Sequence, residues 1–465
     1  MRNELRTLIF ASVAVGCGDS GGREMTAGGT GTSPTAASLV TLSDSSPTEP
    51  TPTEGSATDS GATAGSVSNS DSQGTETTQT PSAPSSMSDT NDSGIKTDLG
   101  QQPDFGLPSC GGGGGGGGGD PDFSYIWIAN SAQNTISKID TQTLVELGRY
   151  LVRPDGLGNP SRTSVNLSGD VVTASRSGGF TKFHARLEDC VESNGIPGIQ
   201  TATDANFLPW DQEECRAWHT PMAYESQRPA AWTQGTFNPG TCKYSDQKVW
   251  TSGNNIPEDG AVDVLLVNGD TGAIEATIPV TGINPDYYGI YGAAVDKNGN
   301  FWGSQLSQGW LIFIDLQTKQ VKQWPMATSG YGMTVDSKGY VWTCASAASR
   351  FDPMTETWTS AQAGGYTGCM ADADENGLLW LSAGGQGIVG INRDTLAVEK
   401  SCPAGGPSYG ISIDYEGYVW GVTGATATKW DPVTCQSWQY AGLTGAYTYS
   451  DMTGYALSNA GTPSG

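Results

Sequence analysis

The chain has 465 residues, a formal net charge of −25 and only 15% charged residues. Proteins that bind nucleic acids need clustered lysines and arginines, which displace counterions from the phosphates. With 23 Lys and Arg against 48 Asp and Glu, the composition excludes a basic nucleic-acid-binding protein, and we expect no nucleic-acid partner.

The first 17 residues have the pattern of an export signal. Arg2 and Arg6 precede an apolar run over residues 8–15, far shorter than the roughly 20 residues that cross a bilayer. The run ends in AVGC, which resembles the lipobox of bacterial lipoproteins. This resemblance implies a lipidated Cys17 and a chain anchored to the cell envelope, at the outer membrane or cell surface of a Gram-negative bacterium. The alternative is an ordinary secretory signal with an incidental cysteine.

Residues 18–122 consist almost wholly of Gly, Ser, Thr, Pro, Asp and Glu, and end near the stretch CGGGGGGGGGD. Such a composition cannot bury enough apolar surface to offset the entropy of ordering, so we expect a disordered linker. About 100 flexible residues would have a reach of roughly 55 Å. The linker would therefore hold a following domain away from a membrane.

Beyond residue 122, three short patterns recur with a period of about 40 residues. The first is a strand that ends in Asp, as in YGMTVD at 331–336. The second is a turn and a strand that ends in Trp, as in KGYVW at 338–342. The third, as in IDLQT at 314–318, has Asp or Asn before a turn and is typical of a hairpin. It occurs seven times, and in one copy His184 takes the place of the Asp or Asn. These features predict an all-β fold, a seven-bladed β-propeller spanning residues 123–457.

The two ends of this domain complement each other. SYIW at 124–127 matches the second strand of a blade and has no first strand before it. At the far end, AYTYSDMTGYAL at 446–457 aligns with YGISIDYEGYVW at 409–420. A C-terminal strand is therefore predicted to complete the first blade and close the ring, although residues 455–457 also resemble a second strand. Residues 458–465 are predicted to form a disordered tail.

The connection at about 190–246 departs from the repeat and is interpreted as an insertion on the propeller, because it lacks a core pattern of its own. It contains Trp210, Trp218 and His219. It leads into the third blade from the face where the inner strands begin. We therefore expect these three side chains to cover the mouth of the central channel.

In a propeller, the innermost strands line the axis, and the loops that lead into them form the face that usually binds ligands. We call the residues at these positions the axial mouth. They are Tyr291, Tyr331, Thr367, Tyr409, Tyr447, Arg162 and Arg228. Aromatic rings with two arginines suit an anionic or sugar-like ligand. The alternative is that the tyrosines only pack the channel.

Besides Cys17, the chain has eight cysteines, an even number that indicates disulfides in an exported protein. Cys344 follows the Trp strand of one blade and Cys369 begins the next, which predicts one pair. Cys402 and Cys435 lie on the outer parts of adjacent blades, which predicts a second. No CxxC spacing occurs and there are only two histidines, so the sequence does not favour a Cys/His metal site.

One turn has the residue order of a calcium loop. DADENG at 372–377 offers oxygens from Asp372, Asp374 and Asn376 at alternate positions. The corresponding turns of other blades read DKNG, DSKG and DYEG, which are plain hairpin turns, and no later carboxylate follows at the usual ligand positions. We therefore expect a structural turn and no cofactor, with calcium as the alternative.

The repeats resemble the streptogramin (virginiamycin B) lyases and the wider NHL and YVTN propellers, through the pattern GxxxD followed by GxxW. In the lyases, catalytic histidines precede the Gly or Ala of PHGI or PHAI strands, and glutamates follow the Trp of WFTE-like strands. In this chain the positions of the lyase histidines hold Tyr291, Tyr331, Thr367 or Tyr409. The positions of the lyase glutamates hold Gln305, Ala345, Ala383 or Thr423. The base and the metal-supporting carboxylate of the family are thus absent at the matching positions.

Together these features favour a surface-tethered lipoprotein whose propeller is a binding module. Its partner would be a small molecule, a glycan or a surface protein, and it would act as a monomer that contacts the membrane through its lipid alone. The alternative is a streptogramin-lyase-like enzyme with a rearranged site at the axial mouth, for which His219 would be the candidate base. A binding module can be rich in Tyr and Arg, whereas a lyase needs a positioned base.

Overall fold

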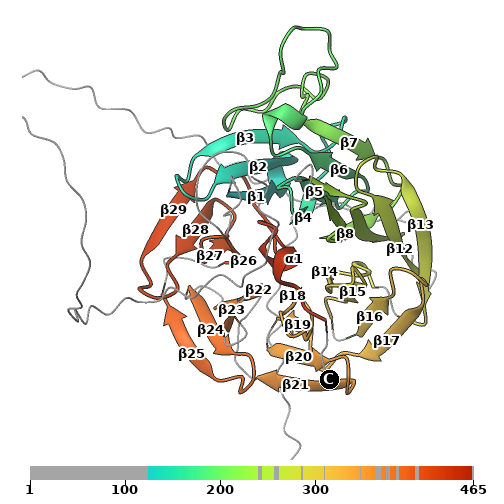
Figure 1. Ribbon diagram of the computed structural model, residues 1–465, viewed down its shortest axis with the longest axis vertical. Coiled ribbons are helices and arrows are strands. Elements are labelled where there is room, and N and C mark those ends of the chain that lie inside the picture. Colours follow the sequence, from blue (N-terminus) through green and yellow to red (C-terminus); the bar gives the residue numbers. More distant parts are fainter. Residues whose placement is uncertain are drawn as a thin grey trace, which may run out of the picture. The chain divides into compact units, whose positions relative to one another are not determined.

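A computed structural model describes residues 124–462, apart from 239–242, 256–260, 284–285, 308, 346, 362–367, 373, 375–376, 384–386 and 404–407. These residues form seven antiparallel β-sheets arranged as blades around a central axis (Figure 1). The predicted seven-bladed β-propeller is therefore confirmed. No helix among the described residues has the length and apolar character needed to cross a bilayer.

The strands follow the chain from blade to blade. Blade 1 comprises β1 (Tyr125–Asn130), β2 (Thr135–Asp140) and β3 (Glu146–Leu151), and blade 2 comprises β4 (Pro160–Val165), β5 (Val171–Ser175), β6 (Phe180–Phe183) and β7 (Arg216–Thr220). Blade 3 comprises β8 (Ser226–Trp232), β11 (Lys248–Asn254), β12 (Ala261–Asn268) and β13 (Ile274–Thr281), with the hairpin β9 (Thr236–Asn238) and β10 (Lys243–Ser245) between β8 and β11. Blade 4 comprises β14 (Gly292–Val295), β15 (Phe301–Ser304), β16 (Trp310–Ile314) and β17 (Val321–Pro325).

The remaining blades repeat this order from the axis outward. Blade 5 comprises β18 (Gly332–Val335), β19 (Val341–Cys344), β20 (Ala348–Asp352) and β21 (Thr357–Ala361). Blade 6 comprises β22 (Cys369–Ala371), β23 (Leu378–Ser382), β24 (Ile388–Asn392) and β25 (Val398–Cys402), and blade 7 comprises β26 (Gly410–Ile413), β27 (Val419–Val422), β28 (Thr426–Trp430) and β29 (Ser437–Ala441). The connections contain the short 3₁₀ helices η1 (Ser131–Gln133) and η2 (Leu187–Asp189), and α1 (Tyr455–Asn459) follows the last blade.

A buried aspartate explains why the chain repeats the pattern YGMTVDSKGYVW. Asp336 Oδ1 accepts hydrogen bonds from the backbone N–H groups of Lys338 and Tyr340, both at 2.9 Å, and so closes the turn. Its Oδ2 accepts the indole N–H of the buried Trp342 at 2.9 Å. Gly339 has φ +80°, a conformation that favours glycine. Trp302 and Trp420 donate in the same way to Asp296 and Asp414, so in these three copies one carboxylate fixes both a turn and a core tryptophan.

The C-terminal segment closes the ring, as predicted. Residues 446–452 lie along β1, in the place of the inner strand that blade 1 lacks. Tyr447 N donates to Ala129 O at 3.0 Å, and Trp127 N donates to Met452 O at 2.9 Å. The chain then forms α1 over the axis instead of a second strand (Figure 1).

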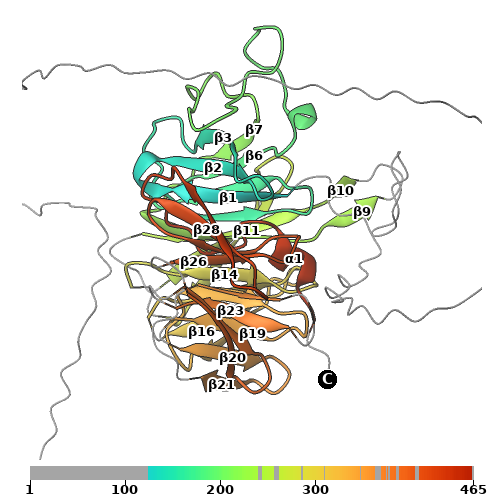
Figure 2. The same ribbon diagram turned by 90° about the vertical axis from the view of Figure 1, so that its left-hand side faces the viewer.

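We distinguish two faces of the propeller. The inner strands begin at the tyrosine face, beside Tyr291 and Tyr331, and end at the aspartate face, beside Asp296 and Asp336. Helix α1 and the β9–β10 hairpin lie on the aspartate face (Figure 2). Gly461 N donates to Asp336 O at 2.9 Å, which holds the chain after α1 against this face.

Two predicted boundaries differ from the structure. Residues 458–461 are not a free tail: Asn459 and Ala460 are each 8% exposed, because α1 packs its buried side chains into the end of the channel. The stretch interpreted as one insertion contains β7, β8 and the β9–β10 hairpin. The loop that departs from the repeat is 184–215, which projects from the outer edge of blade 2 (Figure 1).

Three disulfides cross-link the described residues. The predicted pairs are confirmed: Cys344–Cys369 joins blades 5 and 6, and Cys402–Cys435 joins blade 6 to the β28–β29 turn of blade 7. The third, Cys190–Cys215, closes the loop 184–215 and was not predicted. Cys17, Cys110 and Cys242 lie outside the described residues. Several disulfides in one chain indicate an extracytoplasmic location.

Candidate ligand site at the axial mouth

Tyrosine rings fill the end of the central channel on the tyrosine face. Tyr291 and Tyr449 are each 2% exposed and stack with their ring planes 14° apart and centroids 5.4 Å apart. The Tyr331 ring lies 4.3 Å from that of Tyr449, and the hydroxyls of Tyr291 and Tyr447 are 2.9 Å apart. The sequence placed Tyr291, Tyr331 and Tyr447 at this position. The structure adds Tyr449, from the same closing segment.

A buried arginine lies among these rings. Arg162, on the inner strand β4, is 1% exposed, and its guanidinium carbon is 3.7 Å from the centroid of the Tyr449 ring. Its Nη1 and Nη2 donate to the backbone carbonyls of Tyr449 and Tyr331, each at 3.1 Å. Its Nε is buried without a hydrogen-bond partner in the described part of the chain. Burial lowers the pKa of Arg162 from its ordinary value.

Two further arginines surround the mouth. Arg176 lies in the β5–β6 turn, with its guanidinium carbon 4.8 Å from the Tyr447 ring centroid and Nη1 donating to Asn159 Oδ1 at 2.6 Å. Arg228, on β8, is 3% exposed and lies 5.3 Å from the Tyr291 ring centroid. Within the described residues, no ion pair is assigned to Arg162 or Arg176. Three cations therefore converge on one group of tyrosines.

The outer layer of the mouth is partly open. Tyr409 and Tyr447 are half-buried, with ring centroids 5.7 Å apart. Burial raises the pKa of Tyr447 above its ordinary value, so its hydroxyl remains a neutral hydrogen-bonding group at physiological pH. Thr367, the remaining predicted mouth residue, lies outside the described residues. This layer presents aromatic faces and hydroxyls above the buried guanidinium.

Unpaired buried polar atoms gather near the mouth. Within the described residues, Ser161 Oγ, Ser304 Oγ and the Tyr449 hydroxyl have no hydrogen-bond partner, and neither do Arg162 Nε and Arg176 Nε. Buried polar atoms in native proteins are nearly always paired, and an unpaired one usually has a functional or solvent explanation. The mouth thus holds hydrogen-bonding capacity that the fold itself does not use.

Trp218 and His219 do not lie at the mouth, which corrects the prediction. Both are on β7, the outermost strand of blade 2, at the opposite edge of the sheet from the axis. Trp218 packs on Phe180 in the core between blades and donates its indole N–H to Gly269 O at 3.0 Å. The segment that contains them is needed as the fourth strand of blade 2, and so cannot fold over the channel.

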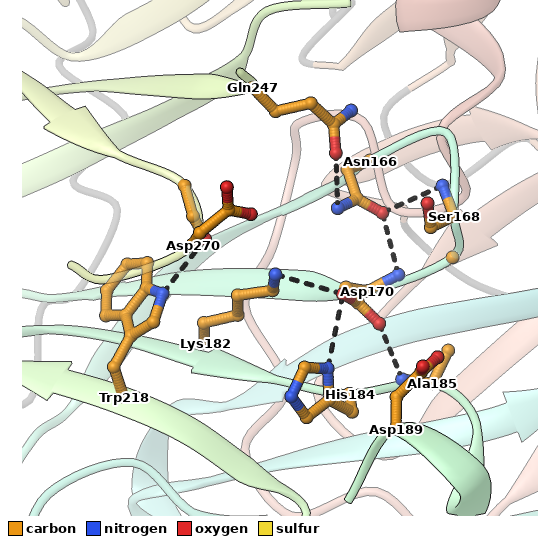
Figure 3. Close-up of polar contacts among 12 residues, drawn as sticks. Asn166, Ser168, Asp170, Lys182, His184, Ala185, Asp189, Trp218, Gln247 and Asp270 are labelled. Carbon is orange, nitrogen blue, oxygen red and sulfur yellow. Dashed lines mark hydrogen bonds and ion pairs between the residues drawn. The ribbon is translucent and has the colours of Figure 1, made fainter. Parts of the chain in front are cut away.

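A polar cluster at the aspartate end of blade 2 accounts for His184 (Figure 3). His184 Nδ1 lies 3.4 Å and Lys182 Nζ 3.0 Å from Asp170 Oδ2, while Asp170 Oδ1 accepts the Ala185 N–H at 2.9 Å. Burial alone would raise the pKa of Asp170, but the hydrogen bond from His184 and the charge of Lys182 lower it to about 2. These contacts give His184 a structural role as a partner of Asp170.

The calcium-like turn is only partly described. Asp372 Oδ1 accepts hydrogen bonds from Asp374 N at 3.3 Å and from the Tyr455 hydroxyl at 3.2 Å. Asn376 lies outside the described residues. Asp372 therefore links its own turn to α1, and calcium binding at this turn stays an untested alternative.

No protein-family model matches the chain, and no curated protein matches it. Solved structures do resemble it. A protein of unknown function from Desulfotomaculum acetoxidans is 12% identical, with a TM-score of 0.48 over 70% of this chain and 100% of that one. Apo AztD from Citrobacter koseri is also 12% identical, with a TM-score of 0.42 over 70% of this chain and 97% of its own. At this identity the resemblance concerns the fold alone.

Proposed function

We propose that this propeller is a binding module, held at the cell surface, whose ligand site is the axial mouth and whose ligand carries an anionic group. The observation that carries the proposal is Arg162, a guanidinium 1% exposed to solvent that makes no ion pair within the described residues. Burying a cation without a counter-charge is costly, and a ligand anion would supply that charge.

The surroundings of Arg162 support this assignment. The chain as a whole has a net charge of −25, yet Arg162, Arg176 and Arg228 gather around one cluster of tyrosines. In a poorly solvated site, electrostatic attraction is stronger than it is at an exposed surface. Tyr409 and Tyr447 would contribute stacking surfaces and neutral hydroxyl donors. This combination selects an anion that is attached to a ring or to a hydroxylated body.

Calorimetric titration of the purified protein tests the proposal. Glucuronate, glucose 6-phosphate and a sulfated sugar would be compared with glucose, the uncharged reference. Arg176→Gln and Tyr447→Ala change the outer mouth, and Arg350→Gln serves as the control, because Arg350 also lies over a tyrosine ring, 4.7 Å from the centroid of Tyr340. Melting temperatures would establish that each variant folds.

We expect at least one anionic ligand to bind and glucose not to bind. Loss of a charge-assisted contact should weaken affinity about tenfold or more in Arg176→Gln, while Arg350→Gln should retain the original affinity. The proposal fails if no anion binds, or if neither Arg176→Gln nor Tyr447→Ala changes the affinity for any anion that binds.

We also propose that Cys17 carries the lipid and that residues 18–122 form the tether, on the strength of the AVGC motif and the composition of the segment. Replacing Cys17 with Ser should move the protein from the membrane fraction to the soluble fraction and abolish labelling with a radioactive fatty acid. Labelling that persists in this variant would contradict the anchor.

A further inference from the structure

We propose that the ligand site continues outward from the mouth along blade 2, and that the ligand is an oligosaccharide bearing carboxylates; this rests on the proposed binding function of the mouth. The blade 2 strip, as we name it, consists of Tyr447, Arg176, Arg153, His219, Trp210 and Arg216. These six residues come from the closing segment, the β3–β4 connection, the β5–β6 turn, the loop 184–215 and β7.

The inner half of the strip is continuous with the mouth. Arg176 lies 4.8 Å from the Tyr447 ring centroid. The next two residues of its turn bind Arg153, whose Nη1 donates to Ser177 O at 2.7 Å and to Gly178 O at 2.8 Å. Arg153 also pairs with Asp155 at 2.6 Å, so it serves mainly to position the strip. One turn thus connects the mouth to the outer part of the blade.

His219 presents a hydrogen-bond acceptor in the outer half of the strip. Thr181 Oγ1 donates its proton to Val152 O at 2.7 Å, so its contact with His219 Nδ1 at 2.8 Å requires Nδ1 to be the donor. The lone pair of a neutral His219 therefore lies on Nε2, which has no partner among the described residues. The ring lies against Gly179, where an added Cβ would come within 3.1 Å of His219 Cε1.

The charges around His219 keep it neutral. Burial has the largest effect on the pKa of His219, and together with the charges of Arg153 and Arg216 it lowers this pKa to about 4. The charge of Asp155 raises the pKa by a smaller amount. At pH 5 to 8 the ring is therefore uncharged, and Nε2 can accept a hydrogen bond from a ligand hydroxyl. A protonated imidazole could not do so.

Trp210 and Arg216 complete the outer end. The Trp210 ring meets His219 edge to face, with centroids 5.3 Å apart and planes at 85°. The Arg216 guanidinium carbon lies 4.0 Å from the centroid of Trp210, and its one hydrogen bond within the described residues goes from Nη1 to Trp210 O. Indole faces stack on sugar rings, and the remaining N–H groups of Arg216 are available to a carboxylate.

The length of the strip argues for an oligomer. β4, β5, β6 and β7 lie side by side, and three strand spacings of about 4.8 Å separate the inner from the outer strand by roughly 14 Å. This is longer than one sugar ring. A stacking face, an acceptor for hydroxyls and cations for carboxylates are what an acidic saccharide requires. Single-stranded DNA also stacks on aromatics, but its internal deoxyribose units have no free hydroxyl to donate to the His219 acceptor, so we favour the saccharide.

Titration with a length series tests the strip. Galacturonate and its linear oligomers of two, four and six residues would be compared with maltohexaose, which is neutral, and with hexathymidylate. Trp210→Ala and Arg216→Gln alter the outer end, and Tyr447→Ala alters the mouth. Trp438→Ala is the matched control, because Trp438 is a 37% exposed tryptophan on the outer strand of blade 7.

We expect affinity to rise at least tenfold from the monomer to the tetramer. Trp210→Ala and Arg216→Gln should remove that gain and leave the affinity for the monomer unchanged, and Trp438→Ala should behave as the original protein. If affinity does not depend on length but Tyr447→Ala abolishes binding, the strip is refuted and the mouth survives. If no anion of any kind binds, both proposals fail. Tighter binding of hexathymidylate than of hexagalacturonate refutes the saccharide, and equal binding of maltohexaose refutes the role of charge.

Discussion

Replacing Asp414 with alanine should destabilise the propeller far more than removing a turn aspartate at the surface. Asp414 is 0% exposed and occupies the position of Asp336 in its own copy of the repeat. Its Oδ1 accepts the N–H of Tyr418 at 2.9 Å, and its Oδ2 accepts the indole N–H of Trp420 at 2.8 Å. Oδ1 also accepts the N–H of Glu416 at 3.1 Å, and Lys429 Nζ lies 3.6 Å from Oδ2. The variant leaves the Tyr418 and Trp420 donors without their partner.

The magnitude follows from burial. An orphaned buried donor costs about 1–3 kcal/mol, so two donors cost about 2–6 kcal/mol. The Trp420 indole contact is fully buried and the Tyr418 contact partly buried, so we expect a net loss in the lower half of that range, about 3 kcal/mol. At roughly 2–4 °C per kcal/mol, the melting temperature should fall by about 6–12 °C.

Asp315→Ala is the matched control. Asp315 Oδ1 closes a turn in the same way, accepting the N–H groups of Gln317 at 3.0 Å and Thr318 at 2.7 Å, but these contacts are exposed to solvent. Water replaces the lost acceptor there, so we expect a loss below about 1 kcal/mol. Differential scanning calorimetry at pH 7 compares the two variants. Equal shifts would refute the reasoning that burial, rather than turn closure, makes the repeated aspartate important.

Three further predictions concern the closing segment and the cross-links. Burial raises the pKa of Asp451 from 3.8 to about 6. Its contribution to the free energy of unfolding is therefore fully present below pH 4 and is lost as the pH rises through 6, about 3 kcal/mol in all. Asp451→Asn should flatten the pH dependence of the free energy of unfolding measured by chemical denaturation, and an unchanged dependence would contradict this. Leu457→Ala, at 4% exposure, should cost about 2–5 kcal/mol in the same assay, whereas no loss would mean that α1 is not part of the core. Replacing Cys190 and Cys215 together with alanine should accelerate proteolysis within residues 191–214, and unchanged cleavage would show that the loop is ordered without its disulfide.

The repeat made the fold predictable from sequence. In three copies the aspartate accepts the indole N–H of a tryptophan six residues later, as in Asp336 and Trp342, so this spacing is constrained and remains visible in the sequence. The cysteine pairs 344–369 and 402–435 followed from the same register, because the repeat fixes which strand neighbours which.

The parts that were not predicted lack such coupling. β7 pairs with β6 across a loop of more than thirty residues and carries no turn signal, so RAWHT at 216–220 gives no indication of a fourth strand. At the C-terminus, DMTG at 451–454 imitates the DSKG turn of the repeat. However, β1 already occupies the second position of blade 1, so no place is left for another strand. Asp451 Oδ2 instead accepts the Leu457 N–H at 2.9 Å and the chain turns into α1.

Closure of the ring and assembly of the mouth are one event. Blade 1 has no inner strand of its own, and the segment that replaces it carries both Tyr447 and Tyr449. Arg162 donates to the carbonyls of Tyr449 and Tyr331, and so joins blade 2, the closing segment and blade 5 across the axis. A propeller whose closing segment is detached would therefore lack the aromatic rings of Tyr447 and Tyr449. It would also lack the Tyr449 carbonyl, which accepts a hydrogen bond from Arg162. It follows that an anion bound at the mouth would favour the closed propeller over any open form, because only the closed form contains the complete site.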